Sequence, residues 1–237
     1  MNKDDDFSFG DIAKDFDTHI RSSIPDYETG LMPSCIGLSQ RFIQPGTTVI
    51  DVGCSTGQTL ASIRRANQTA RPTADYIGID IESRFKPHWD KWKEKNLRFE
   101  QRDARTFPFQ GTSLVISQFF VQFISPADKL PLLTRIHDGL VEGGALIIAE
   151  KTLAETARLQ DALTFPYYDR KLANGFSAKE ILDKERRLRG QMTLYTDREL
   201  KNALERAGFA EITSIWRSLM FVGILALKSR NVRRGFG

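Results

Sequence analysis

Cysteine and histidine are scarce in this sequence of 237 residues, which contains two cysteines and three histidines. Cys35 and Cys54 fall in different predicted elements and lack partners at metal-ligand spacing, so the sequence predicts neither a disulfide framework nor a zinc site. His19, His88 and His137 are also far apart. A metal centre would have to be built from carboxylates, and we expect none. No cysteine or histidine constellation identifies a catalytic residue.

Long apolar runs are missing as well. The most apolar run, 219–227, is about as long as one strand, whereas a helix that spans a bilayer needs about 20 apolar residues. The N-terminal residues MNKDDDFSFG are acidic and polar, where a secretory signal would be basic and then apolar. We therefore predict a cytoplasmic protein with no membrane partner.

Charge is only mildly unbalanced, with a net charge of +4. Part of the excess lies in the tail 228–234, and aromatic residues do not interleave with these cations until Phe236. Single-stranded nucleic acids are usually held by cations interleaved with stacking aromatic rings. We therefore interpret the tail as a solvated terminus and expect no direct binding of nucleic acid.

Short runs of β-branched residues alternate with amphipathic stretches, which is typical of a parallel sheet covered by helices. The predicted strands are 48–52, 76–80, 97–100, 113–117 and 145–149, and the helices between them are 56–66, 86–95 and 126–140. A further helix, 197–206, precedes two runs, 212–216 and 221–228, that predict an antiparallel edge hairpin. The pattern predicts one Rossmann-like α/β domain with a seven-stranded, mostly parallel sheet.

Two segments lie outside this alternation. Helices predicted at 12–24 and 33–42 would form an N-terminal lid, 1–46, over the binding cleft. A charged, continuous helical stretch is predicted over 153–189, within a helical insertion at 151–195. We see no domain boundary in the sequence.

The first predicted strand ends in the loop DVGCSTG, residues 51–57. Ligands of open α/β sheets bind at the carboxyl ends of the strands, and this first turn is the usual contact. Gly53 and Gly57 allow the backbone to approach a ligand closely, because a side chain at either position would occupy the space of the ligand. Asp51 can accept a hydrogen bond from an amino group. A dinucleotide loop would need a further glycine where this chain has Leu60.

Carboxylates recur at the ends of the next strands. Asp80 ends the second strand, where it can accept hydrogen bonds from both hydroxyls of a ribose. Asp103 follows the third, beside the small Ala104, and can accept from an adenine amino group. Together with Asp51, these residues predict a site for S-adenosylmethionine and not for a dinucleotide.

Longer segments carry a resemblance to a known family. They are IPDYETG, RFIQPGTTVIDVGCSTG, SQFFVQFISPADKLPLLTRIHDGLVEGGALIIAEK, LANGFSAKEI and ERAGF. The chain resembles the carboxy-S-adenosylmethionine synthases from about Phe16 to Lys228. Ser55 strengthens the likeness, because most methyltransferases have glycine at this position and this family has serine. The resemblance implies a homodimer that binds S-adenosylmethionine and prephenate and releases phenylpyruvate. The resemblance further implies that the product is carboxy-S-adenosylmethionine, which is used in the modification of tRNA wobble uridines.

The resemblance also implies a set of cofactor contacts. By position they are Tyr27 over the cofactor, Gly53, Cys54 and Ser55 at the methionine part, Asp80 and Ile81 at the ribose, and Asp103 with Ala104 at the adenine. Gln118 stands where the family has an asparagine, so we count it among the cofactor contacts with a longer amide.

One departure concerns charge. The family has an arginine that pairs with the carboxylate of its cofactor, and an ungapped alignment places Glu185 there. An arginine would form a two-pronged charge-assisted bond with that carboxylate, whereas a glutamate would repel it. A shift of register would bring Arg186 or Arg187 to the position, and we take these two as candidate ligands of a substrate carboxylate.

Two further functions stay open at this point. One is conventional methyl transfer to a small molecule. This reaction works mainly by aligning sulfur, methyl and acceptor, so the absence of an obvious catalytic dyad does not exclude it. Glu185 favours methyl transfer, whereas the length of the resemblance favours the synthesis of carboxy-S-adenosylmethionine. The other open function is that of a non-catalytic subunit that binds S-adenosylmethionine.

Overall fold

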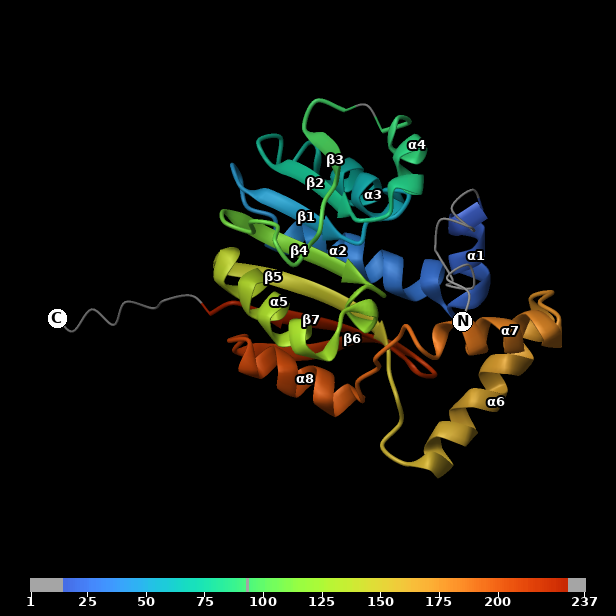
Figure 1. Cartoon of the computed structure of the whole chain (residues 1–237). Coiled ribbons are helices and arrows are strands. Elements are labelled where there is room, and N and C mark those ends of the chain that lie inside the picture. Colours follow the sequence, from blue (N-terminus) through green and yellow to red (C-terminus); the bar gives the residue numbers. More distant parts are fainter. Residues whose placement is uncertain (1–14, 93, 230–237) are drawn as a thin grey trace.

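The structure is a computed structural model that describes residues 15–92 and 94–229 (Figure 1). Part of the predicted helix 12–24 and most of the basic tail 228–234 lie outside the described residues. The strands are β1 (Thr48–Val52), β2 (Asp75–Asp80), β3 (Leu97–Gln101), β4 (Thr112–Gln118), β5 (Leu140–Lys151), β6 (Glu211–Ser218) and β7 (Phe221–Leu227). The helices are α1 (Phe16–Ser23), α2 (Met32–Phe42), α3 (Gln58–Asn67), α4 (Lys86–Trp89), α5 (Pro126–Gly139), α6 (Ala157–Ala173), α7 (Ala178–Leu188) and α8 (Asp197–Arg206).

The seven strands form one sheet in the order β3-β2-β1-β4-β5-β7-β6. Strands β1 to β5 are parallel, and β7 pairs antiparallel with both β5 and β6. This confirms the predicted seven-stranded, mostly parallel sheet with an antiparallel edge hairpin. Because β1 lies between β2 and β4, the strand order reverses beside β1, which is where open α/β sheets bind their ligands.

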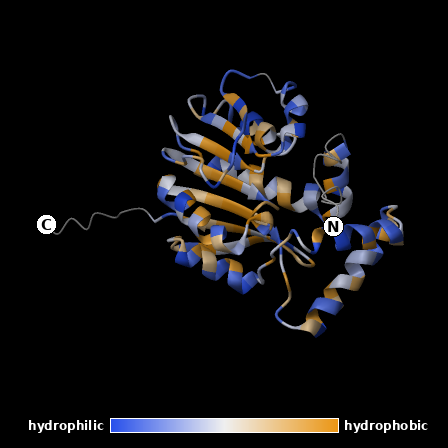
Figure 2. Ribbon diagram, viewed as in Figure 1, coloured by the Kyte–Doolittle hydropathy of each residue, from blue (hydrophilic) through white to orange (hydrophobic). Residues whose placement is uncertain are grey.

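Both faces of the sheet are buried. Successive side chains of β1 alternate between two cores: Val49 packs with α2 and α3, whereas Ile50 and Val52 pack with α5 and α8. Figure 2 shows the resulting band of hydrophobic colour along the central strands. Two buried faces explain why the strands read as nearly continuous apolar runs. Within residues 15–92 and 94–229, no helix combines the length and the apolarity needed to cross a membrane.

Local signals fix the ends of several helices. Pro126 begins α5 directly after Ser125, a position where its missing N–H costs no helical hydrogen bond. Ser177 with Glu180 and Thr196 with Glu199 form capping boxes that begin α7 and α8. Figure 1 shows α6 and α7 meeting at an angle beyond the carboxyl edge of the sheet.

Three predicted boundaries were wrong. The continuous helix 153–189 is two helices, because Gly175 at φ +89° ends α6 in a left-handed turn. The helix 86–95 is only α4, preceded by a 3₁₀ turn at Ser83–Phe85. Strand β5 begins five residues earlier than predicted, at Leu140, with a shift of register between Thr112 and Leu114 where it joins β4.

Substitution of Gly139 tests the packing of α5 against the segment between β3 and β4. An added Cβ would lie 2.4 Å from the Cβ of Phe109 and 2.5 Å from its carbonyl carbon. We expect Gly139→Ala to lower the free energy of unfolding by about 1–3 kcal/mol, because the backbone cannot yield as a side chain can. Gly37→Ala, in the exposed middle of α2 with nothing within 4 Å, is the matched control and should be neutral or stabilising. Denaturant unfolding of both variants decides the point, and equal effects would contradict it.

Candidate active site

A cavity of about 440 Å³ lies at the carboxyl ends of β1, β2, β4 and β5. Asp51, Asp80, Gln118 and Lys151 reach it from these four strands. Helix α1 and the π-helical turn Tyr27–Leu31 cover it, whereas α2 packs beside α3 on the sheet and lines the cavity only with Met32 and Ile36. The described part of the predicted lid that covers the cleft is therefore 16–31. The volume falls within the range of about 300–1,000 Å³ that is typical of small-molecule sites.

The loop between β1 and α3 turns through three left-handed residues, Gly53, Ser55 and Gly57. A Cβ on Gly53 would lie 2.7 Å from the ring of Phe120, and one on Gly57 would lie 2.6 Å from the ring of Phe99. Both glycines are therefore needed for packing against aromatic rings of the protein itself. The predicted close approach to a ligand is possible at Gly53, which lines the cavity, but not at Gly57, which does not line it.

Asp51 lines the cavity and is 3 % exposed. Its Oδ2 atom has no hydrogen-bond partner among the described residues. Burial, together with the nearby charge of Asp80, raises the pKa of Asp51 to about 8. An orphaned carboxylate oxygen that faces a cavity fits a ligand that carries an ammonium group, which would supply both the missing donor and the missing charge.

Asp80 links the loop to the end of β2. Its Oδ2 accepts a hydrogen bond from the backbone N–H of Ser55 at 2.9 Å, and its Oδ1 accepts from Glu82 N at 2.9 Å. Each oxygen keeps a further lone pair for a hydroxyl group. Burial raises the pKa of Asp80, and the two backbone hydrogen bonds oppose that shift. The adjacent Ile81 side chain is 61 % exposed and also lines the cavity.

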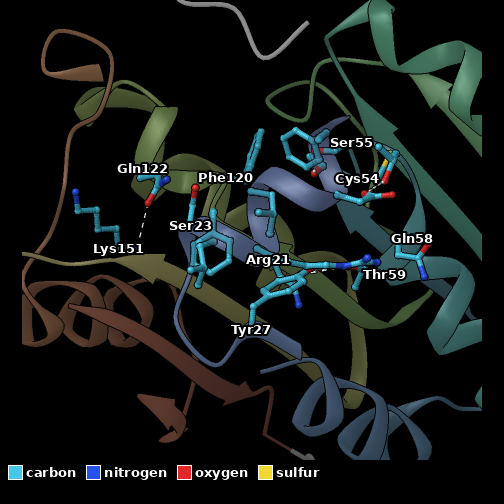
Figure 3. A pocket seen from close by; sticks show the side chains of 18 of the residues that line it. Arg21, Ser23, Tyr27, Cys54, Ser55, Gln58, Thr59, Phe120, Gln122 and Lys151 are labelled. Carbon is cyan, nitrogen blue, oxygen red and sulfur yellow. Dashed lines mark hydrogen bonds between the residues drawn. The ribbon is translucent and has the colours of Figure 1, made fainter. Parts of the chain in front are cut away.

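Tyr27 is held over the cavity by Gln118. The Tyr27 hydroxyl donates to Gln118 Oε1 at 3.2 Å, and Thr59 Oγ1 donates to the same oxygen at 3.2 Å. The amide nitrogen of Gln118 points to Cys35 Sγ at 3.3 Å. Figure 3 shows Tyr27 beside Thr59 at the cavity. The longer amide, noted in the sequence as a departure from asparagine, thus bridges from β4 to the lid.

Three lysines line the opposite end of the cavity, and sequence analysis missed all of them. Lys151 comes from the end of β5, Lys171 from α6 and Lys184 from α7. Figure 3 shows Lys151 with Gln122 on one side of the cavity and the cofactor loop on the other. Glu185 also lines this end, with its Oε1 3.4 Å from Lys151 Nζ. Only Lys151 had a usable signal in the sequence, since it stands two residues after the predicted strand 145–149.

Burial perturbs the charges at this end. Desolvation, with Lys171 and Lys151 nearby, lowers the pKa of Lys184 to about 7. Its Nζ atom contacts His19 Nε2 of helix α1. Burial and the neighbouring Lys184 lower the pKa of His19 to about 4, so the imidazole is neutral at pH 7 and can accept a hydrogen bond.

Several predicted site residues do not reach the cavity. Asp103 accepts hydrogen bonds from the guanidinium of Arg105, at 2.7 Å from its nearer nitrogen, and Ala104 is buried in the core under α5. Arg186 is 74 % exposed and pairs with Asp183 at 3.6 Å, and Arg187 does not line the cavity. Successive helical residues differ in direction by about 100°, so α7 can present Glu185 to the cavity only by turning Arg186 away.

The fold and the cavity define an S-adenosylmethionine-dependent transferase of the class I methyltransferase type. Residues 49–144 match a family model described as a methyltransferase domain. Human N-acetylserotonin methyltransferase, solved with S-adenosylmethionine, is similar in structure with a TM-score of 0.55, 19% identity, and coverage of 84% of this chain and 51% of that one. An O-methyltransferase family protein from Burkholderia thailandensis has a TM-score of 0.57 at 15% identity, covering 94% and 59%.

Closer relatives narrow the class to one family. Carboxy-S-adenosyl-L-methionine synthase of Klebsiella pneumoniae (strain 342) is 34% identical over 92% of this chain and 89% of its own length. The enzyme of the same name from Escherichia coli O1:K1 / APEC is 34% identical over 93% and 90%. The chain belongs to the carboxy-S-adenosyl-L-methionine synthase family, which confirms the resemblance found in the sequence.

Asp51 makes the stability of the ligand-free protein depend on pH. Its pKa is higher in the folded protein than in the unfolded chain, so its contribution is complete below about pH 4 and is lost as pH rises through about 8. Asp51→Asn should remove up to one proton from this dependence, about 1.4 kcal/mol per pH unit between those limits. Urea unfolding at several pH values measures the slope. The exposed Asp75→Asn is the control, and an unchanged slope in Asp51→Asn would contradict the assignment.

Proposed function

We propose that this chain is a carboxy-S-adenosylmethionine synthase, which transfers a carboxyl group from prephenate to the methyl carbon of S-adenosylmethionine. Membership of the family supports the product, and the three lysines at one end of the cavity support an anionic donor. The product would serve the modification of tRNA wobble uridines, as the family resemblance implies. The observation that carries the proposal is the pairing of an acidic and a basic end within one cavity.

The cofactor occupies the acidic end. The orphaned Oδ2 of Asp51 accepts a hydrogen bond from the cofactor's ammonium group, and the free lone pairs of Asp80 accept from the ribose hydroxyls. Gly53, Cys54 and Ser55 line the methionine part, Tyr27 covers it, and Ile81 lies against the ribose and adenine. Contacts of the adenine with Asp103 and Ala104 stay predictions, because Arg105 holds the Asp103 carboxylate in this structure.

The carboxylated donor occupies the basic end. Lys151, Lys171 and Lys184 supply cations where the family resemblance implies one arginine, and Glu185 offsets part of their charge through Lys151. When the cofactor is bound it supplies the methyl carbon that receives the carboxyl group. Atom balance then requires that the methyl proton and the donor's hydroxyl group leave as water, with phenylpyruvate as the second product. The lysines stabilise the carboxylates of donor and product.

Glu185 favours a second candidate function, conventional methyl transfer to a small molecule. A carboxylate that faces the cavity weakens the binding of a carboxylated cofactor by repulsion. In this case the acceptor would be methylated and S-adenosylhomocysteine released. The two functions give products of different mass, so one experiment distinguishes them.

The test is incubation of the purified protein with S-adenosylmethionine and prephenate, followed by mass spectrometry of the nucleoside. We expect a species heavier than S-adenosylmethionine by one carboxyl group in place of hydrogen, together with phenylpyruvate. Lys184→Met should reduce its formation at least tenfold, because a buried amine that can donate to the donor's carboxylate is lost. Lys179→Met, an 86 % exposed lysine of the same helix, is the control. Unchanged prephenate with the wild-type protein would refute the proposal.

A homodimer is the assembly that we propose, and exposed apolar side chains support α6 and α7 as the contact surface. Large hydrophobic residues on segment 153–182 are 44 to 65 % exposed; they are Leu153, Leu159, Phe165, Leu172 and Leu182. Apolar side chains gathered on one projecting hairpin mark an interaction site more often than scattered ones do. The family resemblance implies that the partner is a second copy of the chain.

Phe165 tests this surface. Phe165→Glu should shift the protein from dimer to monomer in light scattering after size-exclusion chromatography, because it places a charge where an apolar ring is buried. Ile81→Glu, at an equally exposed residue of the cofactor cavity, is the control and should leave the mass unchanged. A wild-type protein that is monomeric at micromolar concentration would contradict the proposal.

A further inference from the structure

A second cavity, of about 300 Å³, lies beside the first and shares a wall with it. Five residues line both cavities: Lys151, Tyr167, Glu185, Leu188 and Met192. The ion pair between Lys151 Nζ and Glu185 Oε1 is part of this wall and connects β5 to α7. These five residues form the common wall of the two spaces, and it contains one ion pair, with its atoms 3.4 Å apart.

The rest of the second cavity is mainly apolar and aromatic. Tyr167 and Tyr168 come from adjacent positions of α6, with their ring centroids 6.1 Å apart. Leu153, Leu194 and Met220 complete the apolar lining. Methionine and tyrosine side chains at such a site suit a flat aromatic ring, because sulfur and aromatic edges both pack against it.

Arg189 gives this cavity a cation. It lies one helical turn after Glu185, on the same side of α7, and lines the second cavity but not the first. Among residues 15–92 and 94–229, its guanidinium group has no hydrogen bond or ion pair, in contrast to Arg186, which pairs with Asp183. A guanidinium fork beside an aromatic wall is suited to bind a carboxylate.

We propose that the second cavity is an entry site for an aromatic or cyclic carboxylate, in which Arg189 binds the carboxylate and Tyr167 and Tyr168 contact the ring. From there the ligand passes to the basic end of the first cavity when the Lys151–Glu185 pair separates. The role in entry rests on the proposed function, because the donor is itself a carboxylate. Binding of an aromatic carboxylate in the second cavity does not depend on that function.

The first experiment measures binding alone, by calorimetry on the full chain saturated with S-adenosylmethionine. The probes are 3-phenylpropionate and its neutral amide, 3-phenylpropanamide, which differ in charge but hardly in shape. Arg189→Gln should weaken binding of the acid about tenfold or more and that of the amide less than twofold, since a charge-assisted bond is lost. Arg186→Gln, on the same helix, should change neither. Equal losses for the two probes, or for the two arginine variants, would overturn the proposal.

A second variant locates the probe. Thr164 lines the second cavity but not the first, so Thr164→Phe should fill the space and abolish binding of the acid while S-adenosylmethionine binds as before. Thr164→Val keeps the size of the side chain and should bind normally. If Thr164→Phe still binds the acid, the acid occupies another site and the proposal fails.

Steady-state kinetics tests the role in entry. Arg189→Gln should raise KM for prephenate about tenfold with kcat unchanged, because the residue acts before the chemical step. A lowered kcat would instead place Arg189 at the reaction and overturn the entry role. If the wild-type protein forms no carboxylated product, the proposed function fails, while the calorimetry still decides whether the second cavity binds aromatic carboxylates.

Discussion

Backbone hydrogen bonds from the cofactor loop to the end of β2 fix the geometry on which the whole site depends. The N–H groups of Gly53 and Cys54 both donate to the carbonyl oxygen of Ile79, at 2.8 and 3.0 Å, and Ser55 N donates to Asp80. These bonds force the left-handed turn that only glycine adopts without strain at position 53. They also bring the carboxylates of Asp51 and Asp80 into one cavity. Burial raises the pKa of both groups, and the charge of Asp80 raises the pKa of Asp51 further.

The resulting cavity is electrically asymmetric. Its acidic end is built on β1, which lies at the reversal of strand order, and on the neighbouring β2, whereas its basic end is built on β5 and the two helices that follow. Such an arrangement matches a pair of ligands with an ammonium group at one end and carboxylates at the other. In a cavity of low dielectric, this complementarity contributes more to the binding of the correct pair than the same charges would contribute in water. The lid contacts both ends, through Tyr27 of the π-helical turn to Gln118 and through His19 of α1 to Lys184.

The sheet, its strand order near β1 and the acidic end of the site could be predicted from sequence because each depends on local patterns. A buried parallel strand is a short apolar run, and its last residue is placed by the topology. The basic end could not, because Lys151, Lys171 and Lys184 come together only through the packing of α6 and α7. The contact of Asp103 with a ligand could not be predicted either. Asp103 does follow the end of β3, but the side chain of Arg105, two residues later, binds its carboxylate. The turn at Gly175 does carry local signals, Asn174-Gly175 followed by the N-cap residue Ser177, and the prediction of one continuous helix overlooked them.

Replacing one arginine by several lysines changes how a carboxylate is held. An arginine binds both oxygens through a planar fork and so fixes the orientation of the carboxylate as well as its position. Lysines act as point charges, and here one of them, Lys151, is oriented by Glu185. A glutamate at this position therefore does not simply reverse the charge of the site, because it also pairs with one cation of the cluster that we propose to replace the arginine. The same pair forms part of the wall toward the second cavity, so under the proposed function the identity of residue 185 would affect both the binding of the carboxylate and its route of access.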